Sequence, residues 1–242
     1  MQESMEVTVC SSELVAPAVR RLSLQTRDGR ALPPLTPGDH VRLARLGMRP
    51  VPVSVAARPA PDRYQVLIAD CDGEADRTPQ LSEVLRLDGP GNGMPLQGRP
   101  ASLRLIGAGL GVAPLLPLAR ALSTTDARMR LCWIGRGIAA SALLTELQTE
   151  FGHCVRFHDT AGEGRPDLRT VIGRPEQSTH VYCAGPIPFV DALLAAAAQL
   201  GWSADALHWD RYMPVTVPAG LKQVPPSDSP GTVVSARPMR SS

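Results

Sequence analysis

The stretch RLIGAGLGVAPLLPLARAL, residues 104–122, decides the fold of the second half of the chain. An apolar run at 103–106 is typical of a buried strand, and glycines follow at 107, 109 and 111. Proline at 114 suits the first turn of a helix, because its missing N–H costs nothing there. Such glycines let a ligand approach the backbone, and the N–H groups at the start of a helix attract phosphate. The G-x-G-x-G spacing therefore indicates a dinucleotide site, with an empty structural turn as the alternative.

Bulk composition excludes several classes of protein. The chain has 242 residues, enough for one large domain or two small ones, and a net charge of +2 that does not favour nucleic acid or an anionic membrane as a partner. Residues 1–6 are acidic and lack the apolar region of a signal peptide. The most apolar helical segment, near 189–200, is too short to cross a bilayer and contains Asp191. We therefore expect a cytoplasmic protein.

Metal chemistry is not indicated. The five cysteines form no C-x-x-C pair, and the five histidines are scattered without metal-ligand spacing. We expect no metal site and no disulfide framework. No cysteine follows Cys183, so the sequence predicts that a C-terminal iron–sulfur domain is absent.

The pattern of predicted strands and helices divides the chain into two units and a tail. Residues 1–98 hold short strand candidates separated by proline and glycine, which predicts a small barrel, with one short helix near 80–85. Residues 99–212 alternate between strands and helices, which predicts a parallel sheet with ligands at the carboxyl ends of its strands. Both glycine turns, at 107–111 and 184–186, fall at such ends. Residues 213–242, with six prolines, are expected to be a flexible tail.

Several motifs, in order, resemble the ferredoxin–NADP reductase superfamily, and within it the phthalate dioxygenase reductase and vanillate demethylase reductase type. The resemblance runs from about Leu14 to Tyr212 and rests on five stretches: 35–41, 90–96, 107–114, 180–186 and 201–210. It implies a six-stranded antiparallel flavin-type barrel followed by a parallel-sheet NAD(P)-binding domain. The implied chemistry is hydride transfer from NAD(P)H to FMN or FAD, then single electrons to a separate oxygenase or ferredoxin-like acceptor.

The resemblance also carries candidate site residues. The family's Arg-x-Tyr-Ser flavin motif falls on 51–54, which retains Ser54, the candidate catalytic residue, and has Val53 in the place of tyrosine. Arg49 is a substitute for the phosphate-binding arginine. The remaining cofactor-binding candidates are Arg77, Thr78 and Asn92 in the barrel, and Gly107, Gly109, Gly111, Ala113, Pro114, Arg136, Cys183, Gly185 and Pro186 in the second unit.

Departures from the family pattern fall on positions that contact cofactors. The arginine expected between Pro90 and Asn92 is Gly91, and the only aromatic residue before position 133 is Tyr64. Cys183 stands one residue before its family position, and in a regular strand such a slip points the thiol to the opposite face. Three hypotheses follow: an NAD(P)H-dependent flavin reductase, a flavin-free subunit that docks or regulates within an oxygenase system, and a reductase that uses flavin as a loosely bound substrate.

Overall fold

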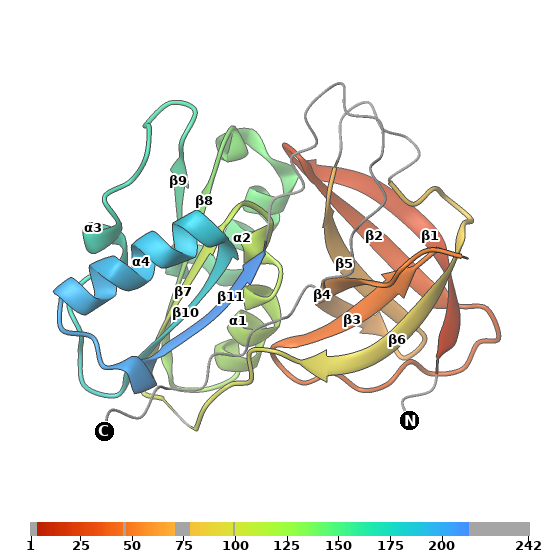
Figure 1. Ribbon diagram of the computed structural model, residues 1–242, viewed down its shortest axis with the longest axis horizontal. Coiled ribbons are helices and arrows are strands. Elements are labelled where there is room, and N and C mark those ends of the chain that lie inside the picture. The colour runs from red at the N-terminus through yellow and green to blue at the C-terminus, as the bar shows by residue number, and fades with distance from the viewer. Residues whose placement is uncertain (1–3, 46, 71–77, 99, 213–242) are drawn as a thin grey trace.

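The computed structural model describes residues 4–45, 47–70, 78–98 and 100–212, which form a barrel and a sheet unit side by side (Figure 1). The predicted tail at 213–242 and the candidate residue Arg77 lie outside the described residues. The last barrel strand ends at Asn92 and the first sheet strand begins at Ser102. The change of fold therefore occurs within the linker between these two residues.

The first unit is a closed antiparallel barrel, as predicted, with strand order β1-β2-β5-β4-β3-β6. Apolar side chains at alternate positions, such as Val7 and Val9, or Val41 and Leu43, fill its interior. The ring of Tyr64 is fully buried there, and its hydroxyl donates to the carbonyl of Pro33. The strands are β1 (Met5–Ala16), β2 (Val19–Thr26), β3 (Asp39–Ala44), β4 (Val51–Ala60), β5 (Arg63–Ala69) and β6 (Val84–Asn92).

The helix expected near 80–85 does not form. Ser82 has a φ of +67°, which a right-handed helix does not allow, and β6 begins two residues later at Val84. The carboxylate of Glu83 accepts the N–H of Gln80 and pairs with Arg45. These side-chain bonds stabilise a turn, and Leu85 then enters the barrel core.

The second unit is the predicted parallel sheet, with order β11-β10-β7-β8-β9. Helices α1 and α2 pack on the face that meets the barrel, whereas α3 and α4 pack on the other (Figure 1). None of the described helices is long and apolar enough to cross a membrane. The elements are β7 (Ser102–Ala108), η1 (Gly109–Val112), α1 (Leu115–Ser123), β8 (Arg128–Gly135), η2 (Ile138–Ala140), α2 (Ala142–Phe151), η3 (Gly152–Cys154), β9 (Val155–Asp159), α3 (Leu168–Ile172), β10 (Thr179–Pro186), α4 (Ile187–Gln199), η4 (Ala204–Ala206) and β11 (Leu207–Tyr212).

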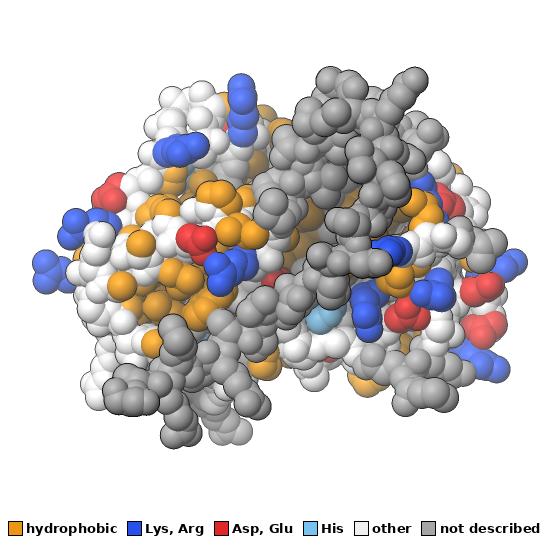
Figure 2. Space-filling view, in the orientation of Figure 1, with side chains coloured by type: hydrophobic (Ala, Val, Ile, Leu, Met, Phe, Trp, Pro, Cys, Tyr) orange, Lys and Arg blue, Asp and Glu red, His pale blue; other side chains and the backbone are white. Residues whose placement is uncertain are grey.

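The outer side of α4 carries several alanines beside the polar residues Asp191 and Gln199. Ala192, Ala195 and Ala198 are exposed along it, and Figure 2 shows hydrophobic side chains gathered over this helix. Its inner side buries Val190 and Leu193 against the sheet. Alanine favours the helix itself, so this composition explains why α4 is the longest helix described.

One hydrophobic core joins the two units. Side chains of α1 and α2 pack against the sheet and also against barrel residues, including Val15, Ala56 and Leu67. Polar interactions also join the two units: Arg21 of β2 pairs with Glu146 of α2, and Arg120 of α1 donates to the carbonyl of Ala56. Because burial of apolar surface is the main favourable term in folding, the two units stabilise each other.

The linker is fastened to the sheet by a buried tyrosine. The hydroxyl of Tyr182 in β10 accepts the N–H of Gln97 at 2.7 Å and donates to the carbonyl of Pro95 at 3.3 Å. Its ring stacks on His208 of β11, with ring centroids 4.4 Å apart. The linker therefore has a defined path over the edge of the sheet.

We expect Leu118→Ala to destabilise the whole molecule by about 2–5 kcal/mol, because it opens a cavity in the core that both units share. The matched control is Leu14→Ala in β1, where the side chain is 53% exposed and the cost should be within about 0.5 kcal/mol. Urea unfolding followed by circular dichroism measures both. Two separate transitions, with only one of them shifted by Leu118→Ala, would contradict a shared core.

Candidate functional site at the junction of barrel and sheet

Two glycine turns meet at the carboxyl edge of the sheet, between the adjacent strands β7 and β10. The helices that follow these strands, α1 and α4, lie on opposite faces, so this is the topological switch point at which such sheets bind ligands. A Cβ added at Gly111 would lie 2.1 Å from the carbonyl oxygen of Ala184. One added at Gly185 would lie 3.1 Å from the Cβ of Ala108. The glycines therefore let the two turns pack directly on each other.

The other predicted residues of the first turn shape its backbone. Gly109 has a φ of +55°, and a Cβ on Gly107 would lie 2.9 Å from the Cα of Val112. Ala113 and Pro114 have helical dihedrals and lead into α1, with Pro114 as the residue that precedes the helix. The indole N–H of Trp133 donates to the carbonyl of Gly109 at 2.9 Å. The bond from Trp133 thus holds the turn against the sheet. Pro186 is the residue that precedes α4, as Pro114 precedes α1.

Tyr212, at the end of β11, places its hydroxyl in the first glycine turn. This hydroxyl accepts the N–H of Gly111 at 3.1 Å and donates to the carbonyl of Ala108 at 2.9 Å. Burial raises the pKa of Tyr212 to about 12, so the group is a neutral phenol at physiological pH. A backbone N–H that would otherwise face a ligand is therefore satisfied within the chain.

The barrel contributes His40 and Ser54 to the junction. These residues pair across β3 and β4, and both lie on the outer side of the barrel, because their neighbours Val41, Val53 and Val55 pack inward. Burial raises the pKa of Asp210 in β11, and the charge of His40 acts in the opposite direction. His40 and Asp210 are thus close enough to interact across the junction.

The remaining barrel candidates are engaged in structure or lie apart. The amide nitrogen of Asn92 donates to the Thr36 hydroxyl at 3.0 Å and to the Pro37 carbonyl at 3.1 Å, and its oxygen accepts the N–H of Met94. Thr78 is half-buried, and its carbonyl accepts from Arg45. Arg49 is exposed just before β4, and Val53 packs against the barrel core.

Of the two remaining candidates in the sheet unit, Cys183 is buried and Arg136 is exposed. Cys183 is buried on the α4 side of the sheet, as the one-residue slip predicts, and burial raises its pKa to about 12. Arg136 is exposed after β8. Next to it, the carboxylate of Asp159 accepts the N–H groups of Gly137 and Ala139 at 2.7 and 3.0 Å. The backbone N–H of Ala161, followed by those of Ala139 and Gly137, lowers the pKa of Asp159. The carboxylate of Asp159 therefore occupies the N–H groups that follow β8.

Tested against a flavin, the described residues fit the ring better than the phosphate. The hydroxyl of Ser54 and the imidazole of His40 offer hydrogen bonds at the junction, and Tyr212 supplies an aromatic ring from the sheet. The barrel's own aromatic residue, Tyr64, lies inside it and presents no face. For the phosphate, Arg49 and the hydroxyl of Thr78 are the described barrel candidates, since the donors of Asn92 are already taken.

Sequence motifs did not single out Tyr212, His40 or Asp210. His40 follows a Pro-Gly turn in a stretch that carries the resemblance, and Asp210 ends another such stretch, so each stood within a quoted motif without a role. Tyr212 lies 101 residues beyond Gly111, and only the strand order brings them together. No local pattern signals a contact of that kind.

Comparisons with known proteins agree with this architecture. No model of a protein family matches the chain. It is 28% identical over 220 residues to the heme-dependent oxidative N-demethylase beta subunit of Ectopseudomonas mendocina (strain ymp), covering 88% of this chain and 70% of that protein. It is 26% identical over 218 residues to vanillate O-demethylase oxidoreductase of Pseudomonas sp. (strain HR199 / DSM 7063), covering 86% and 69%.

Among solved structures, the chain resembles phthalate dioxygenase reductase with a TM-score of 0.77 and 24% identity, covering 89% of this chain and 70% of that one. The resemblance that the motifs indicate is thus confirmed. The relatives include reductase subunits of oxygenase systems, such as the phthalate 4,5-dioxygenase oxygenase reductase subunit of Pseudomonas putida.

We expect Gly111→Ala to destabilise the protein by about 3 kcal/mol, because its Cβ would collide with the backbone of β10. Gly162→Ala is the control: no heavy atom lies within 4 Å of the added Cβ, and the change should be within about 0.5 kcal/mol. Urea unfolding compares the two variants. Equal effects would show that the two turns do not pack as described.

We expect Asp210→Asn to stabilise the protein at neutral pH. Because the folded pKa of Asp210 is raised, wild type loses stability as pH rises from below the unfolded pKa through the folded one, and the asparagine variant does not. The gain over wild type should be larger at pH 8 than at pH 4. Exposed Asp126→Asn is the control. A variant less stable than wild type at pH 8 would mean that attraction to His40 outweighs burial.

Proposed function

We propose that this chain is an NAD(P)H-dependent flavin oxidoreductase of the cytoplasm that passes electrons to a separate oxygenase or iron–sulfur partner. The observation that carries the proposal is the meeting of both glycine turns at the switch point, together with the outward-facing barrel residues Ser54 and His40. The relatives named above support the same class of activity.

Each part of the junction has a task in this proposal. The turn at 107–111 and the start of α1 would hold the dinucleotide, because N–H groups at a helix start attract phosphate. The second turn, at Gly185, packs directly beside the first. Ser54 and His40 would hold the flavin ring by hydrogen bonds. The flavin, when bound, converts a two-electron hydride transfer into single-electron steps.

The shared core supplies the positioning. The packing of α1 and α2 against both units keeps Ser54 in β4 at a fixed place relative to the turn that precedes α1. Such a rigid arrangement is what cofactor enzymes use to bring two reacting groups together. Tyr212 accepts the N–H of Gly111, which a ligand at this turn would have to take over.

A second candidate function is a flavin-free subunit that docks or regulates within an oxygenase system. Two observations favour it: the donors of Asn92 are used within the chain, and Tyr64 is buried in the barrel. This subunit would keep the fold of a reductase and contribute binding surfaces without turnover.

The visible spectrum of the purified protein tests the proposal, before and after incubation with FMN or FAD followed by desalting. We expect a flavin band that survives desalting and NAD(P)H-driven dye reduction. Ser54→Ala should lower flavin retention about tenfold, the effect of losing one hydrogen bond of about 1.4 kcal/mol. Ser203→Ala, at an exposed site, is the control.

Colourless protein that neither retains added flavin nor reduces a dye would favour the flavin-free subunit and overturn the main proposal. Dye reduction that saturates with free FMN, without retained flavin, would instead show flavin acting as a substrate.

A further inference from the structure

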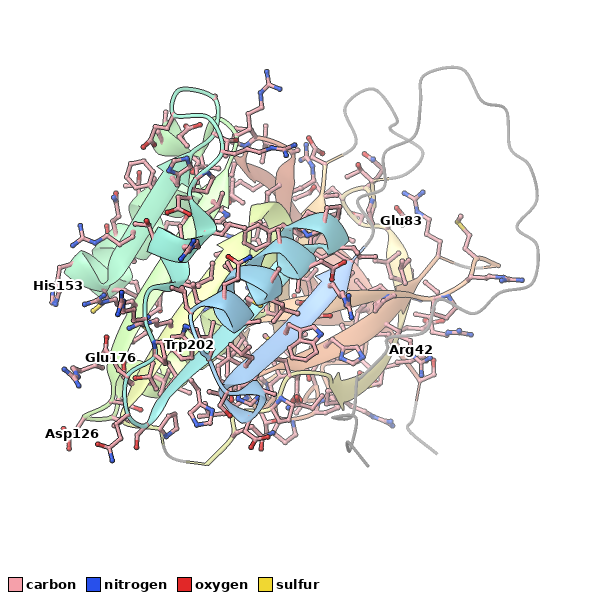
Figure 3. The ribbon with its side chains drawn as sticks, turned by 60° about the vertical axis from the view of Figure 1, so that its left-hand side comes forward. Arg42, Glu83, Asp126, His153, Glu176 and Trp202 are labelled. Carbon is pink, nitrogen blue, oxygen red and sulfur yellow. The ribbon has the colours of Figure 1, made fainter. Side chains whose placement is uncertain are left out.

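The parallel sheet leaves part of one face uncovered. On the side away from the barrel, α4 packs on β10 and β11, while α3 has only five residues. An open groove of about 1140 Å³ remains over β7, β8 and β9. In Figure 3 two residues that line it, His153 and Glu176, lie at the end of the molecule opposite the barrel residue Arg42.

A row of arginines follows this groove. Leu131 and Trp133 of β8 point into the core around α1 and α2, so Arg128 and Arg130 lie on the groove side of the same strand. In β9, Arg156 follows the inward-facing Val155 and pairs with Cys132 of β8. All three arginines are exposed and line the groove.

The carboxylates that line the groove are already paired with other arginines. Glu150 binds Arg120 of α1 at 2.6 Å. Glu176 binds Arg104, which is buried in β7 under the ring of Trp202. Among the described residues, no carboxylate forms an ion pair with Arg128, Arg130 or Arg156.

This face therefore has an uncompensated positive charge. Arg128 and Arg130 are two residues apart on one side of β8, and their like charges repel each other. The net charge of the whole chain is only +2, so the concentration of charge here is local. An anionic partner would relieve the repulsion.

We propose that the groove face, defined by Arg128, Arg130 and Arg156, docks an acidic surface of a partner protein. The guanidinium groups project from extended strands into an open groove, without a turn of backbone N–H groups to enclose a small anion. The edge strand β9 adds the ring of Phe157, which is 40% exposed. Arginine and aromatic side chains are enriched at the centres of protein interfaces.

Docking on the groove face would leave the glycine turns accessible. Arg128 and Arg130 pair with Ser102 and Arg104 in the first half of β7, whereas the turn follows the last residue of that strand. Arg156, which pairs with Cys132, lies nearer the turn, but the groove is on the face of the sheet opposite α1, the helix that follows this turn. The interaction is independent of which cofactor the junction binds, so the two proposals stand or fall separately.

The test uses a fluorescein-labelled peptide of ten glutamates as the probe, with binding followed by anisotropy. We expect binding to wild type that weakens steeply with salt, because the contacts are between exposed charges. The double reversal Arg130→Glu with Arg156→Glu should weaken binding at least tenfold. The matched control, Arg42→Glu with Arg165→Glu, changes the net charge equally at exposed sites outside the groove and should weaken it less than threefold.

Two further readouts complete the test. The groove reversal should leave NADH binding, measured by calorimetry, and the urea unfolding midpoint no lower than in wild type. Equal weakening by both double reversals would overturn the proposal, since only net charge would then matter. Tighter binding of tripolyphosphate or of a single-stranded oligonucleotide than of the peptide, lost in the groove reversal, would also overturn it.

Discussion

The packing of α1 and α2 between the barrel and the sheet is the constraint on which the rest of the structure depends. Neither unit buries all of its own apolar side chains. Val15 and Leu67 of the barrel and Leu118 and Leu144 of the helices belong to one core cluster that both units form. Bringing the units together buries all of them. The same packing fixes the outer side of β4 relative to the turn before α1. The geometry of the junction therefore depends on the shared core.

The glycines of the two turns show how packing and binding can impose the same sequence pattern. A G-x-G-x-G run is expected where a ligand approaches the backbone, yet in this chain the nearest neighbour of Gly111 is the backbone of β10. In this chain the turns follow two adjacent strands, and their glycines let them pack on each other. A glycine motif of this kind is therefore stronger evidence for the packing of the two turns than for a bound ligand.

Much of the fold followed from the sequence because its signals are local. Alternating apolar residues predicted the barrel strands, and the strand–helix alternation after 99 predicted a parallel sheet. The helix expected near 80–85 was wrong, because the positive φ of Ser82 and the bonds of Glu83 are decided by the surrounding turn. The site was harder to predict, since Tyr212 and Asp210 act through contacts that only the strand order creates. The roles of the candidate cofactor residues remain predictions, although Cys183 lies on the face that its register indicates.

Tyr212 links the end of β11 to the first glycine turn. Its phenol bridges the carbonyl of Ala108 and the N–H of Gly111, so it holds the end of β11 to the turn that follows β7, about a hundred residues earlier in the sequence. A ligand that claims the N–H of Gly111 competes with this contact. Occupancy at the turn is thereby coupled to the freedom of the end of β11.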